Sequence, residues 1–174
     1  MLKLIRSSAL IIIILSFVNC SKSPHESTSG QVAGAHIKID YNSPSVRGRQ
    51  IFGELVAYGK LWRAGANKAT TFTTDKDITI EGGILPAGTY ALFVIPMESG
   101  NWTLIFNSDH ERSGATIEGF SVADYEENNK ATDALQVSIK PVETDTLTEH
   151  LTYKITDTGF SLSWENVMLP VAIK

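Results

Sequence analysis

The sequence predicts an all-β fold, a single-domain antiparallel β-sandwich of jelly-roll type with at most one or two short helices. Short runs of alternating apolar and polar residues recur roughly every eight to fifteen residues, and turn residues separate them. Neither a repeat of about 20 to 50 residues nor a heptad pattern is visible. About nine such strands within about 140 residues are enough to form two packed sheets around one hydrophobic core.

Eight runs have the alternation and the β-branched or aromatic content of strands. They are residues 36–40, 69–74, 78–80, 89–95, 102–106, 135–140, 150–156 and 160–164. A last strand, residues 167–173, contains Pro170 and is expected at a sheet edge, because proline cannot donate to a strand ladder. Residues 51–58 could form a short helix, and residues 124–131 a weaker second one.

Turn residues stand between these runs where hairpins require them. Gly82 and Gly83 suit a tight hairpin, and Pro86 with Gly88 predicts a second turn directly before an apolar strand. The residues expected in the core are Trp62, Leu92, Val94, Leu104, Phe106, Val137, Ile139, Leu162 and Trp164.

The N-terminal segment has the layout of an export signal. Lys3 and Arg6 precede an apolar run at residues 9–18, which is too short to span about 30 Å of hydrocarbon as a helix. Cys20, the single cysteine, follows directly. This arrangement resembles a bacterial lipoprotein signal, which implies a signal peptide at residues 1–19 and lipidation of Cys20. The expected location is the periplasm or the outer membrane, with a lipid anchor as the membrane contact.

The segment after the cysteine is polar and rich in glycine and serine. It predicts a flexible tether at residues 20–34, with the β-sandwich domain at residues 35–174.

Charge argues against nucleic acid as a partner. The 15 basic residues include Lys3 and Arg6, so 13 remain against 19 acidic residues once a signal is removed. The basic residues are nevertheless concentrated in one region. Arg47, Arg49, Lys60, Arg63 and Lys68 are interrupted by a single acidic residue, Glu54.

Sequence motifs of catalysis and metal binding are absent. There is no His-Glu-x-x-His, Gly-x-Ser-x-Gly, phosphate loop or cysteine cluster, and no cofactor is expected. Asp109, His110 and Glu111 could ligate a metal only from a loop, so a solvated polar loop is the favoured interpretation. A triad of Ser113, His110 and Asp109 is disfavoured, because triad members converge from separate segments.

The stretch WRAGAN, residues 62–67, is the best candidate for a site. Trp62 should point into the core and Arg63 toward an opening, where its guanidinium suits a carboxylate or phosphate. Gly65 permits a turn with positive φ, and Asn67 tolerates that conformation and adds an amide. Arg47 and Arg49 are expected to join them as ligand-binding residues. Tyr41, Tyr58 or Trp102 would provide an aromatic face.

Three function classes follow from these residues. The first is a non-catalytic binding module for an anionic or hydroxyl-rich ligand, such as a small molecule or glycan. The second is an interaction lipoprotein that docks an envelope protein, in which Arg63 only pairs with Glu54 or Glu165 and Asn67 holds a turn. The third is a hydrolase with unrecognised machinery. Convergence of the three arginines on one cavity would favour the first class.

Three segments together identify a family resemblance. SPSVRGRQIFGELVAYGKLWRAGANKATTF at 43–72, LPAGTYALFVIP at 85–96 and WTLIFN at 102–107 resemble the bacterial family known as domain of unknown function 2911. The resemblance covers roughly residues 41–174. It implies the domain boundary and the candidate site, and it carries no established activity.

Overall fold

The computed structural model describes residues 23–111 and 130–174. Within these residues the fold is all-β and the strand pairing is antiparallel, so the predicted fold class is confirmed. The only helical segment of the described chain is a single 3-10 turn, η2 (Lys130–Thr132). No helix in this part of the chain is long and apolar enough to cross a bilayer.

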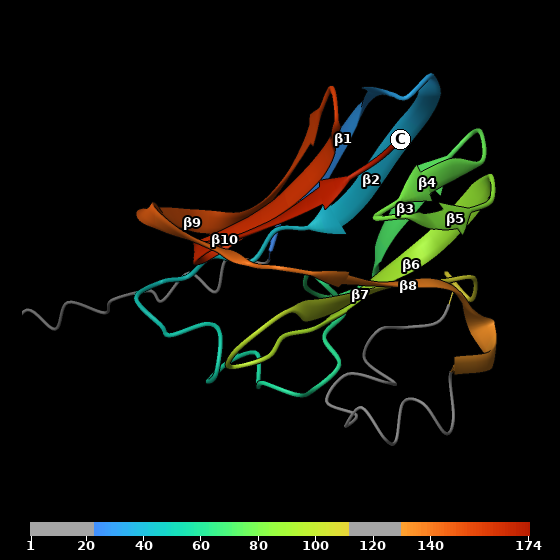
Figure 1. Ribbon diagram of the computed structural model, residues 1–174. Coiled ribbons are helices and arrows are strands. Elements are labelled where there is room, and N and C mark those ends of the chain that lie inside the picture. Colours follow the sequence, from blue (N-terminus) through green and yellow to red (C-terminus); the bar gives the residue numbers. More distant parts are fainter. Residues whose placement is uncertain (1–22, 112–129) are drawn as a thin grey trace, which may run out of the picture.

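One layer of the sandwich is a six-stranded sheet with the order β1-β2-β3-β6-β7-β8. Its strands are β1 (His25–Val32), β2 (Ala35–Asn42), β3 (Thr70–Thr74), β6 (Gly88–Ile95), β7 (Trp102–Asn107) and β8 (Asp133–Ile139). The facing layer is formed by two hairpins, the long β9 (Val142–Thr156) with β10 (Gly159–Ala172) and the short β4 (Ile78–Ile80) with β5 (Gly83–Leu85). Figure 1 shows the β9–β10 hairpin lying across the large sheet.

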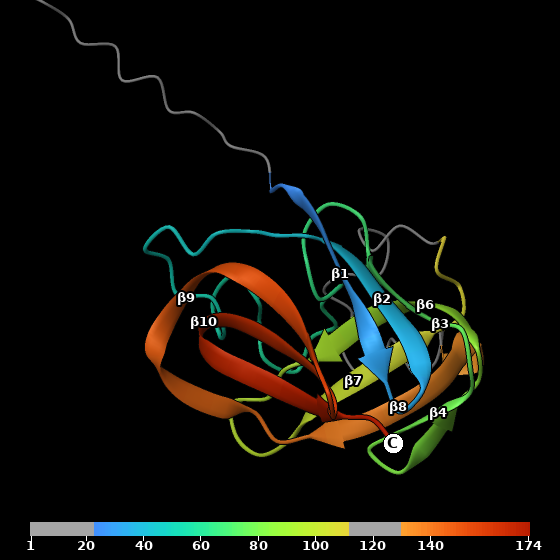
Figure 2. The ribbon, with the colours of Figure 1, turned by 90° about the horizontal axis from the view of Figure 1, so that it is seen from above.

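The β9–β10 hairpin is strongly curved, as Figure 2 shows from above. Its register shifts on both sides of Glu165, which has a φ of 55°. Such bulges bend a strand and increase its twist. As a result, the two ends of β10 meet: the Ile173 amide donates to the Thr158 carbonyl at 2.9 Å. The last residues of the chain also pair with β4, where the Lys174 amide donates to the Thr79 carbonyl at 2.8 Å.

The main core lies between the two layers. All nine residues predicted for it are buried, and the least buried of them, Val137, is 7% exposed. Alternation explains the success for the eight of them that lie on strands, because residues two apart on a strand point to the same face. β6 departs from alternation, since its last six residues are all buried. Its outward side chains, among them Phe93, pack in a second apolar cluster with Leu61 and Ile105.

The tether prediction is wrong for residues 25–32, which form β1 and pair along their whole length with β2. The sequence HESTSGQV has no apolar face, and only Val32 is buried. Backbone hydrogen bonds to β2 hold this edge strand, and they leave no signature in side-chain polarity. Gly30 lies so close to Ile155 that an added Cβ would come within 2.9 Å of the Ile155 Cγ2.

The helix predicted at 51–58 is also wrong. This segment forms turns, in which the Val56 amide donates to the Ile51 carbonyl at 2.9 Å and the Gly53 amide donates to the Val56 carbonyl at 2.9 Å. Gly53 has a φ of 95°, which no right-handed helix contains. The second predicted helix lies mostly outside the described residues, and its end forms η2. β5 was not predicted, and the runs 160–164 and 167–173 are parts of one strand, β10.

Candidate functional site

The candidate site is built from the long loop between β2 and β3, residues 43–69, which is fastened to β9. The Val46 amide donates to the Glu149 carbonyl at 2.8 Å, and the Leu151 amide donates to the Pro44 carbonyl at 2.9 Å. The buried Ser43 hydroxyl donates to the Leu151 carbonyl at 2.8 Å. The loop therefore continues the pairing of β9 by a few residues, which gives its first half a defined position.

The WRAGAN turn is held at both ends. Trp62 exchanges two backbone hydrogen bonds of 2.8 Å with Val94 of β6. The Ala64 carbonyl then accepts two hydrogen bonds, one from the Thr70 hydroxyl at 2.9 Å and one from the Tyr153 hydroxyl at 2.8 Å. The Trp62 indole donates to the Gly65 carbonyl at 3.2 Å. The carbonyls that a tight turn leaves without partners are thus satisfied by side chains of the core.

Complete burial raises the pKa of Tyr153 far above its ordinary value, an effect larger than the opposing one of the hydrogen bond with Thr70. The hydroxyl therefore stays protonated and remains a donor to Ala64 at all ordinary pH values.

Asn67 has the positive φ that it was expected to tolerate, at 60°, whereas Gly65 does not have one and Ala64 does, at 51°. Gly65 serves a different purpose, because an added Cβ would lie 2.7 Å from the Thr70 hydroxyl and 3.3 Å from the Asn42 carbonyl. Close packing of the turn against β2 and β3 requires a glycine there.

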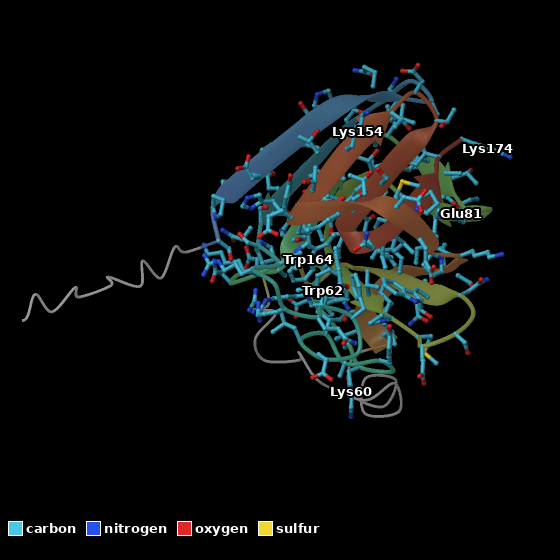
Figure 3. The ribbon with its side chains drawn as sticks, turned by 90° about the vertical axis from the view of Figure 1, so that its left-hand side faces the viewer. Lys60, Trp62, Glu81, Lys154, Trp164 and Lys174 are labelled. Atoms are coloured by element: carbon cyan, nitrogen blue, oxygen red, sulfur yellow. The ribbon has the colours of Figure 1, made fainter. Side chains whose placement is uncertain are left out.

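Aromatic side chains form the floor of the site. Trp62 and Trp164 stack with their ring centroids 5.7 Å apart and an interplanar angle of 20°. Figure 3 shows the two side by side in the interior. Phe52 contacts both tryptophans edge to face, at 6.0 and 6.2 Å. The Trp164 indole nitrogen is buried and has no hydrogen-bond partner among the residues that the structure describes.

A cavity of ≈ 400 Å³ opens above this floor. We name it the arginine cavity, because Arg47, Arg49 and Arg63 all line it. Its other lining residues are Ser23, Pro44, Ser45, Leu55, Val56, Trp62, Gly65, Ala66 and Trp164. The predicted convergence of the three arginines is therefore present in the structure. Trp62 is buried, as predicted, and Arg63 is half-buried and lines the cavity.

The three arginines differ in their surroundings. Arg49 is exposed, and its guanidinium donates to the Val46 carbonyl at 3.0 Å and the Ser45 carbonyl at 2.6 Å, so it stabilises the loop as well as lining the cavity. Arg47 is exposed and has a φ of 51°, with its amide donating to a Glu149 carboxylate oxygen at 3.0 Å. Arg63 is half-buried, and its Nε is fully covered.

Four residues that were predicted for the site lie elsewhere. Asn67 is exposed at the turn and does not line the cavity. Tyr41 is in the core, with its ring 4.8 Å from that of Tyr153. Tyr58 and Trp102 line a separate cavity of ≈ 310 Å³. Trp164, together with Trp62, supplies the aromatic surface that was expected from Tyr41, Tyr58 or Trp102. It lies about 100 positions along the chain from Arg63, so no local motif joins them.

The proposed ion-pair partner Glu165 has a different contact. One of its carboxylate oxygens accepts a hydrogen bond from the Ile51 amide at 3.1 Å, so Glu165 fastens the β10 bulge to the loop.

In the described part of the chain, Asp109, His110 and Glu111 do not belong to a group of three or more potential metal ligands. The His110 Nδ1 lies 3.2 Å from the Ser108 carbonyl, while Ser113 lies outside the described residues. A different serine and histidine do meet, at the rim of the arginine cavity. The Ser45 hydroxyl is 3.1 Å from the His150 Nδ1, across a β-bridge between the loop and β9. In the described part of the chain, no carboxylate forms an ion pair with His150.

Comparison with known proteins gives a family and no activity. Neither the curated proteins nor the solved structures include a match. A family model described as protein of unknown function DUF2911 matches residues 23–173. This range includes β1 and nearly the whole described fold. The chain therefore belongs to the DUF2911 family, as the three sequence segments indicated.

Proposed function

We propose that this chain is an envelope-anchored lipoprotein whose β-sandwich is a non-catalytic binding module for an anionic or hydroxyl-rich ligand. The observation that supports the proposal is the convergence of Arg47, Arg49 and Arg63 on one cavity, above two stacked tryptophans. Guanidinium groups hold carboxylates and phosphates through paired, charge-assisted hydrogen bonds. The cavity volume of ≈ 400 Å³ falls within the range of small-molecule sites.

The lining also suits the neutral part of such a ligand. Trp62 and Trp164 offer an apolar wall, and the Ser45 hydroxyl stands at the rim. A sugar phosphate or a short dicarboxylate would place its charge on the arginines and its carbon skeleton on the wall.

A thermal-shift screen of the purified mature protein tests this function. The probes are inorganic phosphate, sugar phosphates, dicarboxylates and neutral sugars, each at low and high salt. Wild type should unfold at a higher temperature with at least one class of anion, and salt should weaken the effect. Arg63→Lys keeps the charge and removes the planar fork, so it should lower affinity by about tenfold with little change in the unprobed midpoint.

Lys154→Gln is the matched control. It removes one positive charge from an exposed position on β9 that does not line the arginine cavity. Figure 3 shows Lys154 away from the tryptophan pair. Binding by this variant should equal that of wild type. If no probe stabilises wild type and Arg63→Lys unfolds more easily, the cavity is structural and the interaction-lipoprotein alternative replaces the binding module.

The lipid anchor has its own test. Radiolabelled palmitate should be incorporated by wild type and not by Cys20→Ala. Absence of label from the wild-type chain would contradict the lipoprotein proposal, and it would leave the cavity unaffected.

A hydrolase is the second candidate, and the contact between Ser45 and His150 favours it. A nucleophile within hydrogen-bond reach of a base is the minimal element of acyl transfer. A fluorophosphonate probe would label Ser45 in an active serine hydrolase, and Ser45→Ala would abolish the label. We rank this function second because the described residues supply no group that orients His150.

A further inference from the structure

The position of the arginine cavity relative to the start of the domain identifies a ligand class. Building on the proposed function, we infer that the cavity binds the phosphate of an anionic phospholipid headgroup in the same membrane that holds the lipid anchor. The inference rests on covalent reach, on the charge of the loop and on an exposed apolar side chain at the cavity.

Covalent reach places the cavity next to the anchor. Ser23 is a lining residue, and its carbonyl accepts a hydrogen bond from the Asn42 amide group at 3.3 Å. The next residue is also held, because the Ser43 amide donates to the Pro24 carbonyl at 2.8 Å. Only three peptide steps separate Ser23 from Cys20, and a fully extended chain covers at most about 10 Å over that length. A lipid on Cys20 therefore holds the cavity at the membrane surface, within reach of lipid headgroups.

The loop that forms the cavity carries the matching charge. Between residues 47 and 68 it has five basic residues and one acidic residue, whereas the chain as a whole is acidic. Besides the three arginines of the cavity, the loop carries Lys60 and Lys68, and both are exposed. Basic groups close to a membrane surface are attracted by anionic lipids, and the acidic remainder of the domain is repelled. This distribution would turn the cavity toward the bilayer. Figure 2 shows the part of the loop that directly follows β2 close to the start of β1.

Leu55 adds an apolar contact. It lines the arginine cavity and is 51% exposed. A side chain in this position can enter the boundary between headgroups and acyl chains while the arginines contact phosphate.

The lipid anchor also explains why a solvent-exposed cavity can be sufficient to bind a headgroup. Arg47 and Arg49 are exposed, so a free anion bound to them would remain partly solvated and weakly held. An anchored chain meets headgroups at a high effective concentration, because the anchor makes the second contact intramolecular. A weak site can then be occupied most of the time. A free metabolite at low concentration would need a more enclosed cavity.

The experiment uses the lipidated full mature chain reconstituted in vesicles. One set of vesicles contains phosphatidylcholine alone, and the other contains phosphatidylcholine with phosphatidylglycerol. Calorimetry measures the unfolding midpoint, and amide hydrogen exchange measures protection of residues 43–69. Inorganic phosphate and glycerol phosphate are added to the neutral vesicles as soluble probes. Three variants are compared with wild type: a double variant that combines Arg47→Gln and Arg63→Gln, the single variant Leu55→Ser, and the control Lys154→Gln.

We expect phosphatidylglycerol to raise the wild-type midpoint by a few degrees and to slow amide exchange in the loop. The double arginine variant should lose both effects, Leu55→Ser should lose part of them, and Lys154→Gln should keep both. Inorganic phosphate and glycerol phosphate should raise the midpoint only at concentrations far above the effective concentration of headgroups at the vesicle surface.

Two results would overturn the inference. If soluble phosphate or glycerol phosphate stabilises wild type and phosphatidylglycerol adds nothing, the ligand is a free anion, and only the proposed binding function is retained. If neither lipid nor soluble probe has an effect that depends on the arginines, the headgroup inference fails together with anion binding at this cavity.

Discussion

The Ala64 carbonyl provides a sharp test of how the WRAGAN turn is held in place. It accepts hydrogen bonds from the Thr70 hydroxyl at 2.9 Å and from the Tyr153 hydroxyl at 2.8 Å, and Ala64 is fully buried. Tyr153→Phe and Thr70→Val each remove one donor while nearly keeping the shape of the side chain. In either single variant the carbonyl keeps one partner. Each should therefore lower the free energy of unfolding by about 1 kcal/mol, the usual net value of one intramolecular hydrogen bond.

The double variant should lose more than the sum of the singles. It leaves a buried carbonyl with neither hydroxyl donor, which costs about 1 to 3 kcal/mol beyond the lost bonds. The expected total is about 3 to 5 kcal/mol, with a coupling energy of at least about 1 kcal/mol. For a domain of about 150 residues, each kcal/mol corresponds to roughly 2 to 4 °C in the unfolding midpoint.

Urea unfolding of the four proteins measures this coupling. Tryptophan fluorescence is a suitable signal, because the Trp62 indole donates to the neighbouring Gly65 carbonyl. Thr73→Val serves as a control, since it removes a hydroxyl that bonds Thr89 on the same sheet without contacting the turn. If the loss in free energy of unfolding in the double variant equals the sum of the two single losses within about 0.5 kcal/mol, the two hydroxyls do not both satisfy this carbonyl, and the explanation of the turn is wrong.

Three further predictions concern pH, the β9–β10 curvature and the aromatic floor. Burial raises the pKa of Tyr153 above its ordinary value of 10.0, so the free energy of unfolding should be level below about pH 10 and should fall above it. In Tyr153→Phe this free energy should fall less steeply with pH, and urea titrations across this pH range measure the difference. Gly159→Ala should prevent stable folding, because an added Cβ would collide with the Val171 carbonyl. Gly100→Ala, where the space around the Cα is open, should lower the free energy of unfolding by only about 1 kcal/mol. Equal unfolding midpoints of the two variants in calorimetry would contradict this. Phe52→Ala should cost about 3 to 5 kcal/mol by leaving a void beside both stacked tryptophans, and an unchanged urea midpoint would show that the loop collapses onto it.

Side-chain alternation predicted most of the large sheet and eight of the nine chosen core residues, while the ninth, Trp62, lies in the loop between β2 and β3. Alternation succeeds because one face of each strand packs against the opposite layer, which selects apolar residues at every second position. β1 could not be found in this way. It is an edge strand whose residues are mostly exposed, and backbone hydrogen bonds that any sequence can make hold it to β2.

The candidate site was likewise predicted only in part from the sequence. The density of arginine and lysine between residues 47 and 68 is a property of the sequence, and it indicated Arg47, Arg49 and Arg63 correctly as lining one cavity. Asn67 is close in sequence to Arg63, yet it is exposed and does not line the cavity.

By itself, the sequence determined the fold class, most strands, the inward position of Trp62 and the location of the positive charge. Only the tertiary structure decided which aromatic ring faces the arginines, that Ser23 reaches the same cavity, and that the Ala64 carbonyl is satisfied by Thr70 and Tyr153. The physical reason is the range of the forces involved. Alternation and charge density are local properties, readable along the chain. Stacking of Trp62 on Trp164 depends on how strongly the β9–β10 hairpin bends at Glu165, and that bend results from contacts between residues far apart in the sequence.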